Sequence, residues 1–331
     1  MTPGDQLICR GRGGFLRVDY TEVVKRGKTT NMDMKMIMEM GDQEIVQWLQ
    51  NEGLLKRNLQ CIACGSFLTL TAMNDRDKMG WRCLNYGCDK KNHTVSVRIQ
   101  SFFSGSKLTL KDQVLLVLFW SETISNQKAS RLLKISRKTV TKLFQKFRNL
   151  TSQHFQMHPI QLGGPGIIVQ IDESVFSTKA KYHRGAALHQ KPLWVFGAVD
   201  EDGMGYMEIV EDRTRVTQEA VVINQIRAGS VIHSDCWASY NHISTIANKN
   251  FTHGTVNHSN KDFPFKDPIT GVHTNRIEGY WSKHKRPLKA MCGVARNLLQ
   301  SYIDEFIFKE RIPSGVNKFP VNNFGEIQEK F

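Results

Sequence analysis

The run of residues 167–175 constrains the fold of this chain more than its other stretches do. Its β-branched and apolar residues are typical of a buried strand, yet Asp172 and Glu173 interrupt it where a purely structural strand would continue with Val or Ile. An ionised carboxylate is costly to bury without a partner. We therefore expect a metal ion, another cation or several hydrogen bonds beside these acids, and we favour a metal.

Two further acids lie where elements are predicted to end or begin. Residues 230–235 are typical of a second strand that ends at Asp235, and residues 273–278 lead into an amphipathic, basic helix that carries Glu278. Other strands are predicted at 193–199, 206–210 and 252–256, and a helix at 216–226. This order predicts a mixed α/β domain with a ribonuclease H-like sheet, in which Asp172 and Asp235 lie on neighbouring strands.

The helix after His273 has a clear apolar stripe with charged residues along its edge. Glu278 and Lys285 share one edge of the stripe, and Pro287 is predicted to end the regular helix at about residue 285 or 286. The stripe itself consists of Ile277, Tyr280, Trp281, His284 and Leu288. A last helix is predicted over 301–308 and is expected to pack on the sheet. Three basic residues lie near the end of the helix after His273, namely Lys283, Lys285 and Arg286. They are expected to clamp phosphates, which would fix the register of the protein on DNA without reading the DNA sequence.

The charge of the chain points to a polyanionic partner. Its 331 residues carry a formal net charge of +14, which favours nucleic acid, although a ribosomal or membrane-surface role fits the same charge. The longest apolar run, residues 114–120, is far shorter than the roughly 20 residues that cross a bilayer. The first residues have no apolar signal core. We expect an intracellular protein without a membrane partner, nuclear if the host is a eukaryote.

Four of the seven cysteines have the spacing of a metal site. Cys61, Cys64, Cys83 and Cys88 form a C-x2-C-x18-C-x4-C pattern, close to that of zinc ribbons, in which two knuckles present four thiolates. Neighbouring glycines allow tight knuckle turns, and flanking segments can supply ribbon strands. The pattern predicts structural Zn2+; the alternative is four reduced cysteines in a small β-hairpin.

A helical region follows the cysteines. Residues 110–120 are typical of a buried helix, and segments 125–136 and 137–148 have the pattern of a helix-turn-helix with Ser136 as the cap of its second helix. Lys138 and Lys142 project from the face opposite the apolar one and are predicted to contact DNA. An ordinary helical pair with a solvated basic face explains the spacing equally well, and only the total charge favours DNA.

Each of the three acids also has a purely structural explanation. Asp172 is explained as a strand-end ion pair, Asp235 as a helix cap, and Glu278 as part of a variant capping box that begins at Asn275. Together the three structural explanations account for less of the pattern than one shared site does, because three unrelated roles need not occur in this strand order in a basic protein. Three converging carboxylates can hold a pair of Mg2+ ions for in-line phosphoryl transfer.

Five spaced motifs follow one another in the second half of the chain. They are Asp-Glu-Ser at 172–174, Trp-Val-Phe-Gly-Ala-Val at 194–199, His-Ser-Asp-Cys-Trp-Ala-Ser-Tyr at 233–240, Val-Asn-His-Ser at 256–259 and His-Thr-Asn-Arg-Ile-Glu-Gly-Tyr-Trp-Ser-Lys-His-Lys-Arg at 273–286. These motifs resemble the catalytic domain of Merlin-type DDE transposases and their bacterial insertion-sequence relatives, the group with an ISXO2-like transposase domain. The likeness runs from about residue 167 to 311, and the ribbon and helices upstream also match the arrangement of that family.

The resemblance implies an activity and a site. It implies a ribonuclease H-like fold, cut-and-paste transposition that depends on Mg2+ or Mn2+, and binding to the terminal inverted repeats of a DNA transposon, with a homodimer or larger assembly to join two ends. Asp172, Asp235 and Glu278 take the three acidic, metal-binding roles by position, and Asn275 is the alternative for the third. The other functions to consider are a transposase-derived DNA-binding protein without catalysis, and a ribonuclease H-type nuclease without strand transfer.

The predicted domains follow from these patterns. They are a poorly ordered leader over 1–40, a short helix with the zinc ribbon over 41–102, a helical, helix-turn-helix-like region over 107–150, the catalytic domain over 163–312 and a tail over 313–331.

Overall fold

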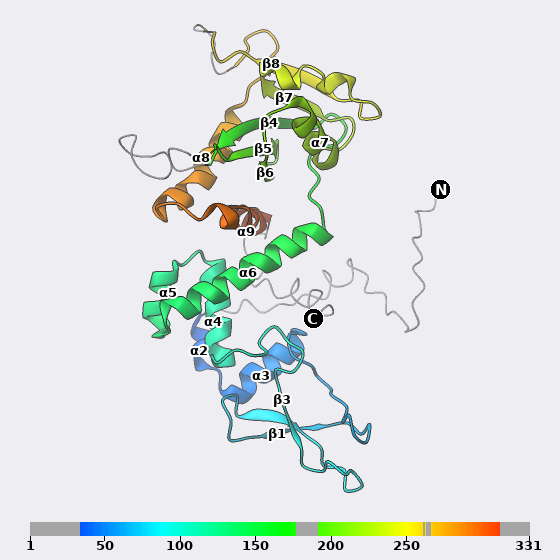
Figure 1. Cartoon of the computed structure of the whole chain (residues 1–331), viewed down its shortest axis with the longest axis vertical. Helices are drawn as coiled ribbons and strands as arrows, with labels where there is room; N and C mark the ends of the chain where they lie inside the picture. The colour runs from blue at the N-terminus through cyan, green and yellow to red at the C-terminus, as the bar shows by residue number, and fades with distance from the viewer. Residues whose placement is uncertain (1–33, 177–190, 261, 263–265, 312–331) are drawn as a thin grey trace.

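A computed structural model of the chain describes residues 34–176, 191–260, 262 and 266–311. Along its longest axis, a five-stranded sheet with its helices lies at one end, a small three-stranded sheet at the other, and a group of helices between them (Figure 1). None of the described helices is long and apolar enough to cross a membrane. The predicted tail over 313–331 and the leader up to residue 33 lie outside the described residues.

The larger sheet is mixed and has the strand order β6-β5-β4-β7-β8. β4, β5 and β6 are antiparallel neighbours, whereas β4 pairs in parallel with β7, and β7 in parallel with β8. The bounds are β4 Ile168–Val175, β5 Trp194–Asp200, β6 Gly205–Val210, β7 Val231–Asp235 and β8 Thr252–Val256. The predicted mixed α/β class is confirmed, and the first acid-bearing strand lies beside the second.

Helices cover both faces of this sheet. α8 (Asn275–Ala290) lies on the face that carries Asp172, where Trp281 packs against Gly197 of β5. α7 (Arg215–Gln225) and the short 3-10 helix η3 (Ala238–Tyr240) contribute to the opposite side. Because side chains alternate along a strand, neighbouring residues of β4 serve two different environments.

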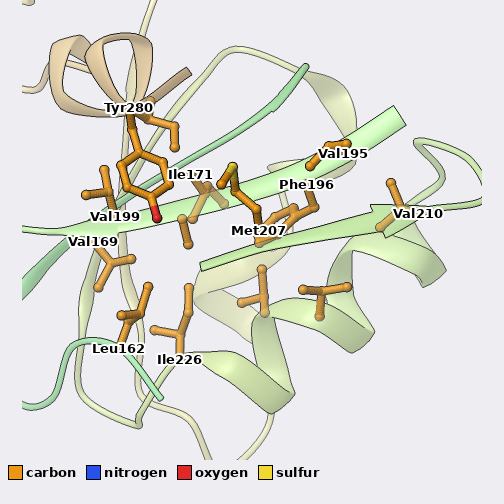
Figure 2. Close-up of a cluster of buried hydrophobic side chains, with 14 of the residues drawn as sticks. Leu162, Val169, Ile171, Val195, Phe196, Val199, Met207, Val210, Ile226 and Tyr280 are labelled. Atoms are coloured by element: carbon orange, nitrogen blue, oxygen red, sulfur yellow. The ribbon is translucent and has the colours of Figure 1, made fainter. Parts of the chain in front are cut away.

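The core of this domain is a continuous apolar cluster. Figure 2 shows side chains of β4, β5 and β6 packed together, with Ile226 from the segment after α7 and Tyr280 from α8 at the edges of the cluster. Ile171 and Phe196 are fully buried. Strand residues are therefore apolar on both faces, as expected for a sheet covered by helices.

α8 does not end before Pro287, as the sequence predicts, but continues to Ala290. Proline lacks the N–H that would bond to the carbonyl group four residues earlier, so one helical hydrogen bond is lost. Leu288 is buried against the sheet cluster. Burial of Leu288 stabilises the last turn and offsets the hydrogen bond that Pro287 cannot make.

The helical region joins the two sheets through one long helix. Its helices are α4 (Leu110–Ser121), α5 (Asn126–Leu133) and α6 (Arg137–Met157). Ser136 caps α6 as predicted, since its Oγ accepts a hydrogen bond from the Thr139 N–H at 3.2 Å. α6 extends nine residues beyond the predicted end at residue 148.

The last helix, α9 (Leu299–Arg311), packs on α6 as well as on the sheet. Arg148 and Glu305, both buried, lie 3.6 Å apart, and Ser152 donates a hydrogen bond to Asp304. Phe308 belongs to the apolar cluster of α4 and α6. The sequence predicted only the contact with the sheet, so the link between the two regions is a finding of the structure.

The small sheet consists of β1 (Thr69–Ala72), β2 (Met79–Arg82) and β3 (Thr94–Ser96) in that order. α3 (Asp42–Asn51) precedes it, as predicted for a short helix before the cysteines. The sequence predicts a poorly ordered leader over 1–40, but the last residues of this range differ, because Met34–Glu39 form helix α2. Ile37 is completely buried there, and this packing orders a segment that has no sustained sequence period.

Candidate functional sites

Asp172 and Asp235 lie in one row of the sheet, on the same face. Gln170 of β4 pairs with His233 of β7 in parallel register, and each aspartate lies two residues further along its strand. Side chains two residues apart point to the same face. The proximity is also electrostatic, because the charge of Asp235 contributes to raising the pKa of Asp172.

Asp172 is a largely buried carboxyl group with an unusual titration. Burial raises its pKa to about 6, a hydrogen bond from Trp281 opposes the shift, and the charges of Glu173 and Asp235 add to it. The Trp281 Nε1–H donates to Asp172 Oδ2 at 2.9 Å. Lys285 reaches the same region, where its Nζ donates to Ser174 Oγ and lies 5.0 Å from the centre of the Phe176 ring.

Asp235 ends β7 and makes a local turn, not the helix cap of its structural explanation. Its Oδ1 accepts the backbone N–H of Trp237 at 2.9 Å, which turns the chain toward η3, whose N-cap Trp237 has no side-chain cap bond. The turn uses one carboxylate oxygen, so the turn and a metal ligand are compatible roles for the same side chain.

Glu278 lies in the first turn of α8 and is half exposed. Its Oε1 is 3.9 Å from His258 Nε2, and the same His258 nitrogen lies 3.0 Å from Thr274 Oγ1. The start of α8 is capped from β4 instead: Gln170 Oε1 accepts the backbone N–H groups of Arg276 and Ile277. The variant capping box is therefore not what holds this helix end, and Glu278 remains directed toward solvent and His258.

The third acidic position stays open between Glu278 and Asn275. Asn275 is the first residue of α8 and is exposed. Residues 275, 278, 282 and 285 follow one row of the helix surface, because positions three and four apart are neighbours. Lys285 on this row reaches the Asp172 region, so both candidates lie on the appropriate side. The three carboxylates are not gathered into a compact ligand group; within the described ranges only the four cysteines form one.

Glu173, the second acid of the strand, is satisfied by protein groups. Its Oε2 accepts two hydrogen bonds from Arg213, at 3.0 and 2.8 Å, and its Oε1 accepts the Tyr240 hydroxyl group. The Arg213 guanidinium also lies over two indole rings, 4.6 Å from the centre of the Trp194 ring and 4.1 Å from that of the Trp237 ring. Glu173 therefore serves the interior, whereas Asp172 faces α8.

The five basic residues predicted to contact DNA lie in two places. Lys138 and Lys142 are exposed near the start of α6. On α8, Lys285 is partly buried beside Ser174, Arg286 is exposed, and Lys283 pairs with Glu310 of α9. Lys283 is thus turned toward α9, away from the side that Lys285 occupies. Their contact with DNA stays a prediction.

The four cysteines are brought together as their spacing predicts. Cys61 Sγ lies 3.8 Å from Cys88 Sγ, Cys64 Sγ lies 3.8 Å from Cys83 Sγ, and all four sulfur atoms lie within 4.8 Å of one another. A tetrahedron with Zn–S bonds of about 2.3 Å has sulfur atoms about 3.8 Å apart. A disulfide needs a distance near 2.05 Å, so these are free thiols, gathered into one candidate ligand set for a metal ion.

Sequence reasoning missed several residues that shape the carboxylate site. Gln170 and Trp281 lie in apolar stretches, whose pattern predicts core residues. Arg213 lies in a predicted loop that carries no motif. A signal existed for the first two, since a buried amide or indole N–H needs partners, but the partner itself depends on the tertiary structure.

Comparison with known proteins shows what the domain that contains this site is similar to. Residues 161–311 match the family model described as an ISXO2-like transposase domain. Two solved structures, a pre-cleavage Mos1 transpososome and the Mos1 strand transfer complex, are similar at 9% and 10% identity with TM-scores of 0.29 and 0.25. Each alignment covers 66% of this chain, and 77% and 76% of the respective Mos1 chains. The search among curated proteins gave no match. The match over residues 161–311 agrees with the resemblance seen in the sequence motifs, and this part of the chain is similar to ISXO2-like transposase domains.

Proposed function

We propose that this protein cleaves and joins DNA strands at the terminal inverted repeats of a transposon, with divalent metal held by Asp172, Asp235 and Glu278. One observation carries the proposal: two aspartates share a row on one face of the sheet, at neighbouring parallel strands, beneath the helix that carries Glu278. The carboxyl ends of parallel strands are common positions for ligand sites in α/β proteins.

The donor set fits Mg2+ or Mn2+. Carboxylate oxygens are the hard ligands that Mg2+ prefers, and Mg2+ keeps several waters, so it does not need a closed protein cage. Burial disfavours the ionised form of Asp172, and a nearby dication would restore it. When bound, the metal would activate the attacking hydroxyl or water and stabilise the leaving oxygen.

Protein groups around the carboxylates have separate tasks. Asp172 and Asp235 provide ligands from a rigid sheet, and Gln170 fixes the start of the helix that carries Glu278. Lys285 lies near Asp172 and can bind a phosphate of the strand that enters the site. Arg286 is exposed one residue further and can extend that contact.

The cysteine cluster is proposed to hold structural Zn2+, and the region around it to position DNA. Two of its sulfur pairs are 3.8 Å apart, as in a tetrahedral zinc site, and all four sulfur atoms lie within 4.8 Å of one another. α5 and α6 form the proposed helix-turn-helix, with Lys138 and Lys142 available to phosphates. Because two transposon ends must meet, the active form is proposed to be a homodimer or larger assembly, nuclear if the host is a eukaryote.

The test is nicking of supercoiled plasmid by the full chain in Mg2+ or Mn2+. Asp172→Asn, Asp235→Asn and Glu278→Gln should each lower the rate about 100-fold or more, since metal stabilisation is worth several kcal/mol. Asp202→Asn, which removes an exposed carboxylate from the β5–β6 turn, is the matched control and should nick like the parent. Full activity of Glu278→Gln with loss in Asn275→Ala would transfer the third role to Asn275.

A second assay separates the transposase from the other two functions. A labelled duplex with a free 3′-hydroxyl should become joined to plasmid DNA in the presence of metal. Nicking without joining, even with transposon ends, would indicate a nuclease. Specific DNA binding that persists without nicking or joining would indicate a DNA-binding protein without catalysis.

A further inference from the structure

We propose that Trp281 is a positioning residue of the carboxylate site, whose indole N–H orients Asp172 so that one of its oxygens is presented to the cation. This inference rests on the proposed function. It assigns a task to a side chain that the sequence places in the apolar stripe of α8. The groups that carry it are the Asp172 carboxylate, the Trp281 indole and Gly197.

The hydrogen bond is direct and comes from a buried donor. Trp281 Nε1 lies 2.9 Å from Asp172 Oδ2, and only 6% of the residue is exposed. The indole N–H can only donate, so it bonds to a carboxylate oxygen in either protonation state of the acid. With Oδ2 held, rotation of the carboxylate about its last bond is restricted, and Oδ1 keeps a defined direction.

The position of the indole is itself fixed by the sheet. Gly197 pairs with Asp172 across β4 and β5, and the ring lies over this glycine. A Cβ atom at residue 197 would lie 2.2 Å from Trp281 Cη2 and 2.5 Å from Cζ2. The sheet therefore has space for the indole only because residue 197 lacks a side chain.

A second ring limits movement from another side. Phe176, just beyond β4, meets the Trp281 ring edge-on, with centroids 5.7 Å apart and planes at 72°. Lys285, one helical turn after Trp281, lies over Phe176 and donates to Ser174. The indole is thus held between β5, Phe176 and its own helix.

The simpler explanation is that a buried indole N–H takes any acceptor nearby. Two other buried indoles in the described part of the chain show that burial alone does not require an acceptor. The Nε1 atoms of Trp81 and Trp120 are buried and have no hydrogen-bond partner. This protein therefore buries tryptophan without satisfying its N–H, and the acceptor of Trp281 is a carboxylate of the site.

The test measures Mn2+ binding to the zinc-loaded full chain by electron paramagnetic resonance, without DNA. Trp281→Phe keeps an aromatic ring but removes the N–H, and should raise the Mn2+ dissociation constant about 10-fold, the usual size for a residue that orients a ligand. Trp120→Phe removes an equally buried indole and should leave Mn2+ affinity unchanged. Zinc content and far-ultraviolet circular dichroism verify that both variants are folded.

Other outcomes would overturn the inference. Parental Mn2+ affinity in folded Trp281→Phe, with loss of binding in Asp172→Asn, would make Trp281 a packing residue while the metal site stands. Mn2+ binding by the parent that is insensitive to Asp172→Asn would instead defeat the proposed metal site itself. If Trp281→Phe does not fold, Gly197→Ala displaces the ring and keeps the N–H, and unchanged affinity in that variant would contradict the inference.

Discussion

The cysteine cluster and the carboxylate site are two candidate metal sites built in opposite ways. The cysteines come from residues 61–88, in and beside one small sheet, and their sulfur atoms already lie within 4.8 Å of one another. The carboxylates come from β4, β7 and α8, and they are not gathered into a compact group. Neighbouring carboxylates repel when no cation lies between them, as the effect of Asp235 on Asp172 shows.

The difference indicates where each site derives its geometry. Local knuckles define the cysteine site, so its integrity should depend on the ion and the ligands alone. The carboxylate site depends on strand register and on the position of α8, which distant residues such as Gln170 and Gly197 maintain. Variants in the two regions should therefore fail in different ways.

The largest effect is expected for Cys83→Ser. Cys83 is completely buried within the cluster, and a structural zinc site of this kind contributes on the order of 10 kcal/mol to folding of its domain. The variant should lose stoichiometric zinc, measured by atomic absorption, and its ribbon should become sensitive to protease. Cys236→Ser, at an exposed cysteine outside the cluster, should retain zinc. Full zinc content in Cys83→Ser would contradict the tetrahedral site.

Asp172→Asn should raise the free energy of unfolding when no divalent cation is added, whereas Cys83→Ser should lower the stability of its domain. The pKa of Asp172 is raised from 3.8 to about 6 by burial, so the native state holds a proton that the unfolded state releases between these values. Stability of the parent should therefore fall as pH rises from about 4 to 6, by about 1 to 3 kcal/mol in total. Asparagine removes this penalty.

Urea unfolding at pH 4 and pH 8 measures the effect. The advantage of Asp172→Asn over the parent should be small at pH 4 and complete at pH 8. Mg2+ should reduce the advantage at pH 8, because it favours the ionised parent. Asp202→Asn, at an exposed turn, is the control for the loss of one carboxylate. An advantage that is the same at both values would mean that Asp172 does not titrate as a buried acid.

Gly197→Ala tests the long-range part of the site. The added methyl group would lie 2.2 Å from the Trp281 ring, so the packing of α8 on β5 must shift, at about 1 to 3 kcal/mol. Gly279→Ala is the matched control, since that glycine lies within α8 and a Cβ there meets nothing within 4 Å. It should stabilise the helix by about 0.5 to 1 kcal/mol. Thermal unfolding should therefore show a lower melting temperature than the parent for Gly197→Ala and a higher one for Gly279→Ala.

Patterns of local origin were predictable from the sequence. The strand at 167–175, the cysteine spacing and the Ser136 cap each depend on residues close together in the chain, and the structure has all three. The acids on two predicted strands also indicated which strands would be neighbours. Hydrophobic periodicity and ligand spacing are sufficient for such features.

Features that depend on distant partners were not predictable. Nothing local shows that Asp172 faces α8 whereas Glu173 faces Arg213 and Tyr240, because either phase of alternation buries apolar neighbours. The contact of α9 with α6 and the order of residues 34–39 likewise arise from tertiary packing. The position of Glu278 relative to the aspartates belongs to this class, which is why Asn275 remains its alternative.

The smallest expected effect compares a long-range cap with a local one. Gln170 is fully buried, and its Oε1 accepts two N–H groups at the start of α8, while its Nε2 lies 3.1 Å from His273 Nδ1. Gln170→Met keeps the volume and removes all three bonds. Thr109→Ala removes the ordinary cap of α4, where Thr109 Oγ1 accepts the Asp112 N–H at 3.0 Å. Each variant should lose about 1 to 2 kcal/mol in chemical unfolding.

Of these two variants, only Gln170→Met should change the rate of metal-dependent nicking. Gln170→Met loosens the helix end that carries Glu278 and Asn275, so the rate at limiting Mg2+ should fall several-fold while excess Mg2+ restores part of it. Thr109→Ala loses the same stability at a helix far from the carboxylates and should nick at the parental rate. Equal losses in both variants would mean that global stability alone controls the rate. A parental rate in Gln170→Met would mean that the carboxylate site tolerates movement of α8, and the contrast with the cysteine cluster would then be one of ligand chemistry rather than of assembly.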